Sequence, residues 1–254
     1  MGRTLVPLVV ESEDLRLSGA LAAADDPRLG HDAGVVAGMV PLGITLTSEA
    51  GRALEGADVA IEFALPAATV GNVRLCAGRG LPIVIGTTGH DAAARREIER
   101  AAGTIPVVMA PNMSLGVNLL LRLAELAGRA LDERYDAEIV EAHHRLKVDA
   151  PSGTALGLGA AVARGRGVDH DEAAVYARHG ATGARKPGTI GYAVIRAGDI
   201  VGDHRVIFAG PGECIELAHH AQDRSGFARG ALAAARWVVG RPPGLYSMMD
   251  VLGI

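Results

Sequence analysis

Residues 141–155, EAHHRLKVDAPSGTA, bring several groups that could do chemistry close together in the chain. The segment contains two histidines, His143 and His144, then Lys147 and the turn Pro151-Ser152-Gly153-Thr154. An imidazole can donate a proton, an ammonium can pair with an anion, and the amide groups that begin a helix can bind a carboxylate. The segment therefore offers the groups that binding and reduction of a small carboxylate would require.

The two histidines lie at the end of a predicted strand. Residues 137–144 alternate in hydrophobicity and are rich in residue types compatible with a strand. Because successive side chains of a strand point to opposite faces, His143 shares a face with Ile139 and Glu141. His144 points the other way, so the two histidines are not expected to form a ready-made chelate.

A helix is predicted to begin directly after the turn. Ser152 can cap it, and apolar residues follow at helical spacing over 155–162. A histidine at a strand end is often structural, and a Ser-Gly-Thr helix start is often only a cap. Lys147 carries more weight, because it and Lys186 are the only lysines among 25 basic residues. An ammonium can give up a proton where a guanidinium cannot.

The whole string closely resembles the signature of the bacterial 4-hydroxy-tetrahydrodipicolinate reductase (dihydrodipicolinate reductase) family. Further segments match that family in order and spacing along nearly the whole chain, and together they are very specific. They are Glu62-Phe63, Gly86-Thr87-Thr88-Gly89, Ala110-Pro111-Asn112-Met113-Ser114, Gly188-Thr189-Ile190-Gly191, residues 196–204, and Gly244-Leu245-Tyr246 followed by residues 249–252.

The resemblance implies a reaction and roles for the residues of the segment. His143 matches the position of the general acid, and Lys147 that of a catalytic or substrate-orienting cation. The groups that would hold the substrate's carboxylates are His144 and the amides of Ser152, Gly153 and Thr154. The implied reaction is reduction of 4-hydroxy-tetrahydrodipicolinate to tetrahydrodipicolinate with NADH or NADPH, in the diaminopimelate pathway of lysine biosynthesis.

The resemblance also implies which residues would hold the nicotinamide nucleotide. Two of the matching segments, at 86–89 and 110–114, follow predicted strands, where ligands bind in open α/β sheets. By itself Gly-Thr-Thr-Gly could equally be an ordinary turn. The expected cofactor-binding residues are Phe63, Gly86, Thr87, Thr88, Ala110, Pro111, Asn112, Met113, Arg224 and Phe227; no metal site is expected.

The beginning of the chain departs from the family's pattern. The family starts with a strand and a glycine-rich turn around the dinucleotide pyrophosphate, and Met1-Gly2-Arg3 matches only the last residues of that turn. We therefore expect Met1 to be an internal methionine and the native chain to start upstream. The family's ribose contacts fall on Ala22 and Ala23, with Asp25 able to take the role after a small shift. The sequence leaves NADH and NADPH both open.

Short apolar runs alternate with helical stretches in the first half of the chain, which predicts βαβ units and a parallel sheet. Strands are expected at 15–22, 59–64, 82–86 and 106–110, and helices at 67–78, 92–102 and 114–131. Further strands are expected at 189–196, 205–209 and 214–221, and a last helix at 224–239.

The predicted fold is α/β. A Rossmann-like parallel-sheet dinucleotide-binding domain, N-terminally incomplete, takes residues 1–113 and 223–254. A smaller α+β substrate-binding and oligomerisation domain with a mostly antiparallel sheet takes residues 114–222.

The composition argues against several classes of protein. A net charge of −4 without a basic run argues against a nucleic-acid partner. No stretch approaches about 18 uninterrupted apolar residues, so no membrane span is expected. Cys76 and Cys214 lie far apart, which fits a reducing cytoplasm and offers no zinc-ligand spacing. The expected partners are a small dicarboxylate substrate and further copies of the chain, in the homotetramer that the resemblance implies.

Three of the seven histidines outside the segment carry expectations of their own. His170, between two aspartates, is expected in a solvated loop rather than in a metal site. His219 and His220 would face apart on a strand and be structural or interfacial. The polar loop 164–187 around His170 predicts no function.

Two alternatives to the reductase stay open at this level. One is a truncated, non-catalytic protein that binds the substrate and oligomerises but cannot hold a dinucleotide. The other is a different two-domain nicotinamide-dependent dehydrogenase, such as an aspartate dehydrogenase, which would not be expected to carry the His-His-Arg-x-Lys and Asp-Ala-Pro-Ser-Gly-Thr strings together.

Overall fold

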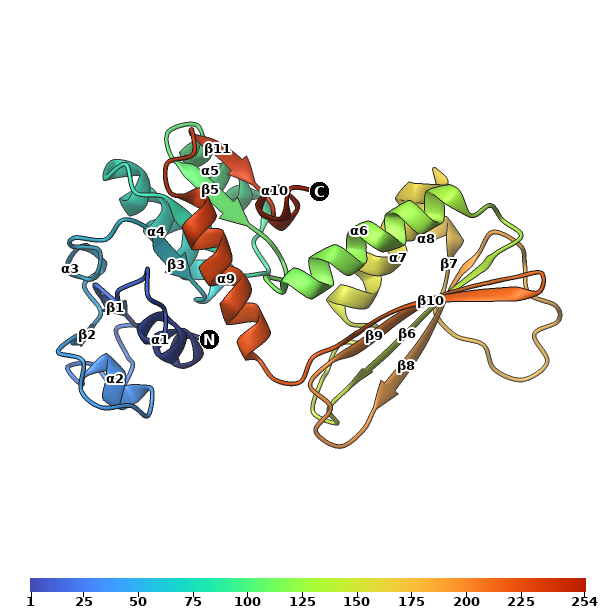
Figure 1. The fold of residues 1–254 in the computed structure, drawn as a ribbon, viewed down its shortest axis with the longest axis horizontal. Helices are drawn as coiled ribbons and strands as arrows, with labels where there is room; N and C mark the ends of the chain where they lie inside the picture. Colours follow the sequence, from blue (N-terminus) through green and yellow to red (C-terminus); the bar gives the residue numbers. More distant parts are fainter. The chain divides into compact units, whose positions relative to one another are not determined.

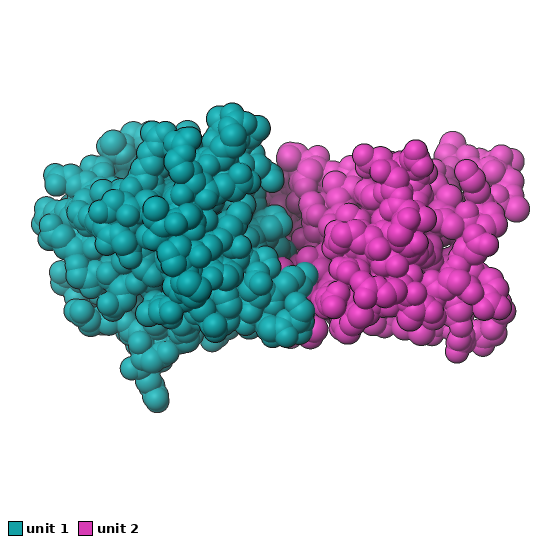
Figure 2. All heavy atoms as spheres, turned by 90° about the horizontal axis from the view of Figure 1, so that it is seen from above, with its two compact units in different colours: residues 1–115, 224–254 teal, residues 116–223 magenta.

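The computed structural model describes residues 1–254, and the chain forms two compact units (Figure 1). Unit 1 consists of Met1–Leu115 and Arg224–Ile254, and unit 2 of Gly116–Asp223 (Figure 2). The chain therefore leaves unit 1 once and returns to it for the last segment.

Unit 1 is built on a four-stranded parallel sheet. Its strands, in spatial order, are β11 (Gly244–Tyr246), β5 (Pro106–Met109), β4 (Ile83–Ile85) and β3 (Ala60–Glu62). The central strands are short runs of Ile and Val, as expected when both faces of a parallel sheet are covered.

Helices cover both faces of this sheet (Figure 1). On one face Ile83, Ile85 and Val107 pack with α4 (Pro66–Gly78) and α5 (Ala92–Ala102). On the other face Val84 and Val108 pack with the second group of helices. That group is α1 (Gly2–Val10), α9 (Ser225–Val238) and α10 (Met248–Leu252). The alternation of side chains along each strand thus divides the core of unit 1 into two layers.

The remainder of unit 1 has little regular structure. β1 (Ala20–Leu21) and β2 (Leu46–Thr47) form a separate two-stranded parallel sheet, and α2 (Ala33–Val36) and α3 (Ala50–Ala53) are single turns. The strand expected at 15–22 is therefore shorter than predicted. Leu15 and Leu17 pack against the core, but this stretch has no neighbouring strand to pair with.

Unit 2 is built on a five-stranded mixed sheet. Its spatial order is β10 (Glu213–His220), β9 (Asp203–Gly210), β6 (Asp136–His143), β8 (Ile190–Arg196) and β7 (Ala174–Val175). The pairs β6/β9 and β9/β10 are antiparallel, whereas β6/β8 and β7/β8 are parallel. The predicted fold class is confirmed, with the difference that this sheet is mixed rather than mostly antiparallel. The reason is that a helical crossover follows β6 and returns the chain parallel to it.

Two helices, α6 (Leu115–Ala130) and α7 (Gly153–Arg166), cover one face of this sheet (Figure 1), and α8 (His170–Ala173) follows α7. Their buried residues form one core with the inward side chains of β6, β8 and β9. α6 and α7 approach closely: a Cβ at Gly128 would lie 2.7 Å from the Val162 carbonyl oxygen, and one at Gly165 would lie 2.2 Å from the Glu125 carbonyl oxygen. Only glycine fits at these two positions.

Candidate active site

The end of β6 brings polar side chains into the interior of unit 2. Ile139, Glu141 and His143 lie on the face of β6 that packs against the helices. Ile139 belongs to the hydrophobic core, and Glu141 is only 1% exposed. A buried carboxylate requires compensating partners, because removal of a charge from water is costly.

Four donors surround the Glu141 carboxylate. Arg196 on β8 donates from Nη2 to Oε1 at 2.8 Å and from Nη1 to Oε2 at 2.9 Å. The backbone N–H of Ser152 donates to Oε1 at 2.9 Å, and His143 Nδ1 lies 2.5 Å from Oε2. Burial works to raise the pKa of Glu141, but the hydrogen bonds from Arg196, His143 and Ser152 outweigh it and lower the pKa. Glu141 is therefore ionised at neutral pH.

His143 has two distinct ring nitrogens in this environment. Since an ionised carboxylate only accepts hydrogen bonds, Nδ1 carries a hydrogen and donates it to Glu141. The other nitrogen, Nε2, lies beside Gly202, where an added Cβ would be 3.1 Å away. The His143 side chain keeps 11% exposure. Nε2 is thus the ring nitrogen that is available for exchange of a proton.

Helix α7 begins next to this pair. Ser152 is its N-cap, and its Oγ accepts a hydrogen bond from Ala155 N–H at 3.2 Å. The same Oγ lies 3.2 Å from Nε2 of His204 on β9. Gly153, which is exposed, and Thr154 occupy the first positions of the helix. The N-terminus of this fourteen-residue helix carries a partial positive charge and lies at these two residues, at the edge of the buried cluster.

His204 is a neutral histidine. It is buried, and its ring lies edge-on to that of His143 with 5.1 Å between centroids. Burial, together with the neighbouring His143, lowers the pKa of His204 to about 4. At neutral pH it serves as a hydrogen-bond partner of Ser152 without adding charge beside His143.

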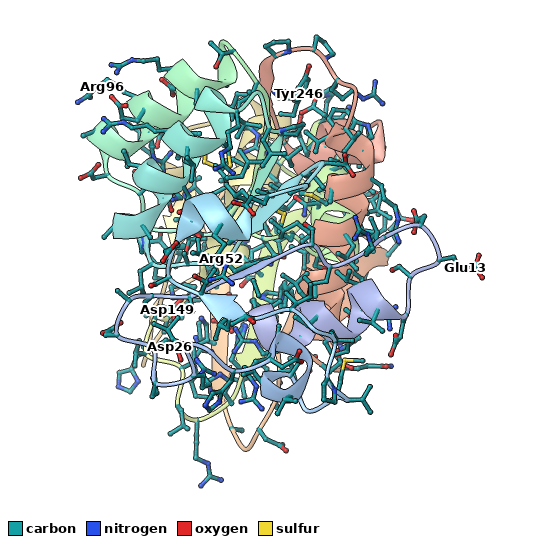
Figure 3. The ribbon with its side chains drawn as sticks, turned by 90° about the vertical axis from the view of Figure 1, so that its left-hand side faces the viewer. Glu13, Asp26, Arg52, Arg96, Asp149 and Tyr246 are labelled. Carbon is teal, nitrogen blue, oxygen red and sulfur yellow. The ribbon has the colours of Figure 1, made fainter.

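Lys147 lies in the loop between β6 and α7. Its Nζ donates to both carboxylate oxygens of Asp149, at 2.7 and 3.0 Å, and its backbone N–H donates to the His144 carbonyl at 3.1 Å. Asp149 is labelled in Figure 3. Arg196 donates from Nη2 to the backbone oxygen of Asp149 at 2.7 Å, so the loop is tied to the Glu141 cluster. The lysine pairing lowers the pKa of Asp149.

The structure thus brings the residues expected in the substrate site together in unit 2. His143, Ser152, Gly153 and Thr154 share the cluster, and Lys147 is anchored beside it by the loop contacts. His144 follows β6, is half-buried and contacts the loop through its backbone oxygen.

In unit 1 several residues expected to bind the cofactor meet at the carboxyl ends of β3 and β4. A Cβ at Gly86 would lie 2.2 Å from Cε1 of Phe63, so the Phe63 ring lies directly on the Gly86 backbone. The Thr87 hydroxyl accepts from Ala64 N–H at 2.9 Å and donates to Glu62 at 3.1 Å. The buried Glu62 side chain also accepts hydrogen bonds from Thr69 and Asn72 on α4. Hydrogen bonds therefore join the loops that follow β3 and β4 at this edge of the sheet.

The other residues expected on the cofactor side are more scattered. Ala110, Pro111 and Asn112 follow β5, and Thr88 is exposed next to Thr87. Met113 is only 1% exposed and belongs to the core, so only its backbone can meet a ligand. Arg224 occupies the N-cap position of α9 without a side-chain capping bond, and Phe227 lies in the first turn of that helix. α1, whose first turn includes the exposed Gly2 and Arg3, packs against α9 and has no side-chain cap.

Sequence reasoning assigned no role to four residues of these clusters: Glu62, Glu141, Arg196 and His204. Glu141 carried a usable signal, since its position two residues before His143 places both on one face of a strand. Arg196 and His204 end the segment 196–204 that matches the family, but they lie 55 and 52 residues from their partners, so no local pattern indicates what they contact.

The other histidines differ in part from expectation. His170 is not in a solvated loop: it begins α8 and its Nε2 lies 2.6 Å from the Tyr192 hydroxyl, which is buried against the sheet. His219 is half-buried near His204, whereas the exposed His220 pairs with Asp203 at 3.1 Å. The two therefore face apart, as predicted.

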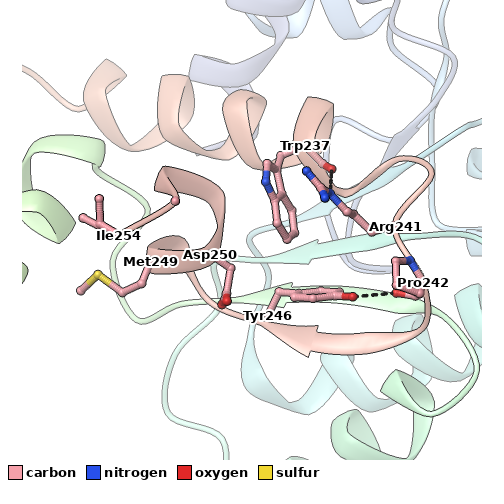
Figure 4. Close-up of a pocket in the computed structure, with 8 residues that line it drawn as sticks. Trp237, Arg241, Pro242, Tyr246, Met249, Asp250 and Ile254 are labelled. Carbon is pink, nitrogen blue, oxygen red and sulfur yellow. Dashed lines mark hydrogen bonds between the residues drawn. The ribbon is translucent and has the colours of Figure 1, made fainter.

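A pocket elsewhere on unit 1 uses none of these residues (Figure 4). It has a volume of about 380 Å³ and lies between α9, β11 and α10. Arg241 stacks over the Trp237 ring at 4.3 Å in its wall, and Tyr246 meets the same ring edge-on.

The fold and the two clusters define a class: a two-domain α/β protein in which a parallel, Rossmann-like sheet is joined to a mixed-sheet domain with a buried acid–base cluster. The family model described as "Dihydrodipicolinate reductase, N-terminus" matches residues 1–113, and the one described as "Dihydrodipicolinate reductase, C-terminus" matches residues 116–252. The chain belongs to the dihydrodipicolinate reductase family.

Curated relatives agree with this assignment. A 4-hydroxy-tetrahydrodipicolinate reductase of Thiobacillus denitrificans is 55% identical over 254 residues, which are 100% of this chain and 95% of the relative. A protein of the same name from Nitrosomonas eutropha is 49% identical over 100% of this chain and 94% of the relative. Among solved structures, the dipicolinate-bound dihydrodipicolinate reductase of Paenisporosarcina sp. TG-14 is 23% identical with a TM-score of 0.78, covering 98% of this chain and 94% of that chain. That structure supports the fold.

No helix of the structure is both long and apolar enough to cross a membrane.

Proposed function

We propose that the chain is an NAD(P)H-dependent reductase that converts 4-hydroxy-tetrahydrodipicolinate to tetrahydrodipicolinate, in the diaminopimelate pathway of lysine biosynthesis. The observation that carries the proposal is the buried His143, held at Nδ1 by Glu141 beside the N-terminus of α7. This arrangement provides a proton donor next to a carboxylate-binding helix end. Curated relatives of that name cover the whole chain, so the non-catalytic alternative is not favoured.

The substrate would bind through its two carboxylates. The amides of Gly153 and Thr154 lie at the partly positive end of α7, which suits one carboxylate. Lys147 and His144 lie in the adjoining segment and would hold the other, with Lys147 exchanging its contact with Asp149 for the substrate. The Ser152 hydroxyl, anchored by His204, would complete this group.

The edge of unit 1 fits a nicotinamide dinucleotide. The Gly86 backbone lies so close to Phe63 that no side chain fits there, and the carboxyl ends of β3, β4 and β5 share one edge of the parallel sheet. The uncapped first turn of α1 suits a phosphate group. Residues expected to hold the cofactor are Phe63, Gly86, Thr87, Thr88, Ala110, Pro111, Asn112, the backbone of Met113, Arg224 and Phe227. Either NADH or NADPH would serve.

The bound nucleotide would supply a hydride to the conjugated ring. That ring would become conjugated before hydride transfer, when the 4-hydroxyl group leaves as water together with a hydrogen of the neighbouring ring carbon. His143 would then donate the Nε2 proton to the electron-rich product, so that a hydride and a proton are added across the double bond. Lys147 and the α7 amides would keep the carboxylates in place as negative charge develops on the ring. Glu141 would hold the remaining Nδ1–H of His143 throughout.

We also propose that the chain assembles into a homotetramer through the face of the unit 2 sheet that the helices leave open. Val140, Ala193, Ile207 and Ala218 lie on that face, and Ala193 and Ala218 are exposed. The Arg205–Glu216 ion pair lies among them, so the face is part apolar and part charged, a composition that suits an interface between copies of the chain. The measurement is light scattering after size-exclusion chromatography, in which a monomeric mass would contradict this proposal.

The unpaired thiols support a proposal for the compartment of the protein. Cys76 is buried and Cys214 is exposed, and neither is paired. We propose the cytoplasm as the site of action, because unpaired thiols persist in a reducing environment.

The test of the function is a steady-state assay with 4-hydroxy-tetrahydrodipicolinate and either NADH or NADPH, followed by nicotinamide absorbance. Turnover with at least one nucleotide is expected. His143→Ala should lower kcat by about 10²–10⁴ and leave nucleotide affinity unchanged. His179→Ala, in the exposed loop after β7, is the matched control. An unchanged kcat in His143→Ala refutes the general-acid role, and failure to bind either nucleotide supports the non-catalytic alternative.

A further inference from the structure

We infer that Glu141, clamped by Arg196, is a positioning residue that fixes the tautomer of His143 and ties it to the N-terminus of α7. This inference rests on the proposed function, in which His143 is the proton donor. The bond to Glu141 explains why Nε2 of that histidine, and not Nδ1, exchanges the proton.

The bonding of Glu141 is saturated. Oε1 accepts from Ser152 N–H and Arg196 Nη2, and Oε2 accepts from His143 Nδ1 and Arg196 Nη1. An ionised carboxylate offers about four acceptor positions, and all of them are used within the protein. The side chain has 0% exposure. Glu141 is therefore neither a substrate ligand nor a proton donor, and its bonds serve to orient its neighbours.

The first neighbour oriented in this way is His143. A neutral imidazole carries one N–H, and the partner of the other nitrogen decides where it lies. Glu141 requires a hydrogen on Nδ1. The form of His143 that can donate carries hydrogens on both nitrogens, and the form left after donation from Nε2 is the Nδ1–H tautomer that Glu141 already holds. No rotation of the ring is needed between the two states.

The second neighbour is helix α7. The Ser152 amide donates to the same carboxylate that holds His143, although the two residues belong to different elements. Gly153 and Thr154 follow Ser152 directly. The position of the proton donor relative to the carboxylate-binding amides is therefore set through one side chain.

Arg196 keeps this arrangement in place. Its fork contacts both Glu141 oxygens, and it also donates to the backbone oxygens of Asp149 and Ile195, each at 2.7 Å. The guanidinium neutralises the buried carboxylate and joins it to the loop that carries Lys147. A lysine could not reproduce this planar, bidentate contact.

The substitution Glu141→Gln keeps the shape of the side chain but changes its hydrogen bonding. A glutamine has nearly the same size but only one acceptor oxygen, and its amide nitrogen is a donor. If the amide nitrogen faces His143, then Nδ1 must become an acceptor and the neutral ring moves its hydrogen to Nε2. If it faces Ser152, the Ser152 amide loses its acceptor. Arg196 faces a donor in either orientation.

The direct test is NMR of protein labelled with ¹⁵N in the histidine rings, with the His143 signals assigned by comparison with His143→Asn. In the wild type we expect neutral His143 to show a protonated Nδ1 with a strongly downfield proton. In Glu141→Gln that proton signal should disappear and Nε2 should become the protonated nitrogen where the amide nitrogen faces His143. Where the amide oxygen faces His143, the signal should shift upfield, because the acceptor is no longer charged. Glu138→Gln is the matched control, because Glu138 lies on the same strand, is also paired with arginine, and points to the opposite sheet face.

Kinetics provide the second readout. Glu141→Gln should lower kcat by about 10²-fold or more, the range of a displaced general acid, while nucleotide affinity stays at the wild-type value. Glu141→Asp, which keeps the charge, should recover part of the loss, and Glu138→Gln should keep wild-type kcat.

Two outcomes overturn the inference. One is a wild-type spectrum in which neutral His143 carries its hydrogen on Nε2, a result that stands even if Glu141→Gln does not fold. The other is a folded Glu141→Gln variant with wild-type kcat. If the wild type shows no reductase activity, the proposed function fails, and the NMR result still decides the role of Glu141.

Discussion

The Nε2 atom of His143 lies against Gly202, at a place where a Cβ atom would be 3.1 Å from it. Gly202 directly precedes β9, and His143 ends β6. Such a separation is tighter than ordinary van der Waals contact, so any side chain at position 202 would crowd the nitrogen that is proposed to donate the proton. The absence of a side chain at Gly202 is therefore part of the site.

Gly202→Ala should raise the activation free energy of turnover by more than it lowers the free energy of unfolding. Crowding in a packed region typically costs about 1–3 kcal/mol, and here the added methyl group meets the reactive nitrogen. Steady-state kinetics and thermal unfolding would measure both effects. Gly157→Ala is the control, because its Cβ would make only ordinary contact with Leu121, 3.4 Å away on α6. Full activity in Gly202→Ala would mean that protons do not leave through this side of the ring.

Lys147→Arg should raise KM for the dicarboxylate and lower kcat/KM by about 10-fold or more, although the charge is retained. The reason is that a guanidinium is larger and planar, whereas the ammonium fits a compact site beside Asp149. The other lysine of the chain supplies the control: Lys186→Arg, in an exposed loop, should leave both constants unchanged. Wild-type kinetics in Lys147→Arg would reduce Lys147 to a surface charge.

His204 should make the stability of the fold depend on pH. Burial lowers its pKa to about 4, against a value near 6.5 in the unfolded chain. Between these values the unfolded state binds the proton and the folded state does not, so stability falls as the pH falls from about 6.5 towards 4. The total loss of unfolding free energy due to His204, complete below about pH 4, is on the order of 3 kcal/mol at 1.36 kcal/mol per pKa unit.

The measurement for His204 is urea unfolding, followed by circular dichroism at pH 7 and pH 5. The wild type should lose more stability between the two than His204→Gln does, because glutamine does not titrate. His179→Gln, at an exposed loop position, should behave like the wild type. Equal losses in the wild type and His204→Gln would contradict a neutral, buried His204.

Gly86→Ala should weaken binding of NADH and NADPH. The added Cβ would lie 2.2 Å from the Phe63 ring, so the ring must move away from the edge of the sheet where the nucleotide is expected. If the cost of about 1–3 kcal/mol falls on the binding free energy, the affinity for the nucleotide falls roughly 5- to 150-fold. Fluorescence titration would detect this. Gly71→Ala in α4 has open space around its Cβ and should bind normally. Unchanged affinity in Gly86→Ala would remove this loop from the nucleotide site.

Local patterns predicted much of the secondary structure. The helix expected at 92–102 is α5 itself, and the helix expected at 67–78 begins one residue earlier as α4. Helix periodicity and capping residues operate over a few positions, which is why they can be read from sequence. The expected strand at 15–22 was too long because strand formation also requires a partner, and only Ala20 and Leu21 find one.

The sequence by itself determined the family, through the order and spacing of its segments, and it placed His143 on the same strand face as Ile139 and Glu141, before a capped helix. The tertiary structure decided what surrounds that histidine. Arg196 reaches Glu141 from β8, and His204 reaches Ser152 and the His143 ring from β9; these strands are the two neighbours of β6 in the sheet. Their approach depends on strand order and on a crossover that makes β8 parallel to β6. Alternation and capping are local properties of the chain, whereas neutralisation of a buried carboxylate depends on which distant strands become neighbours.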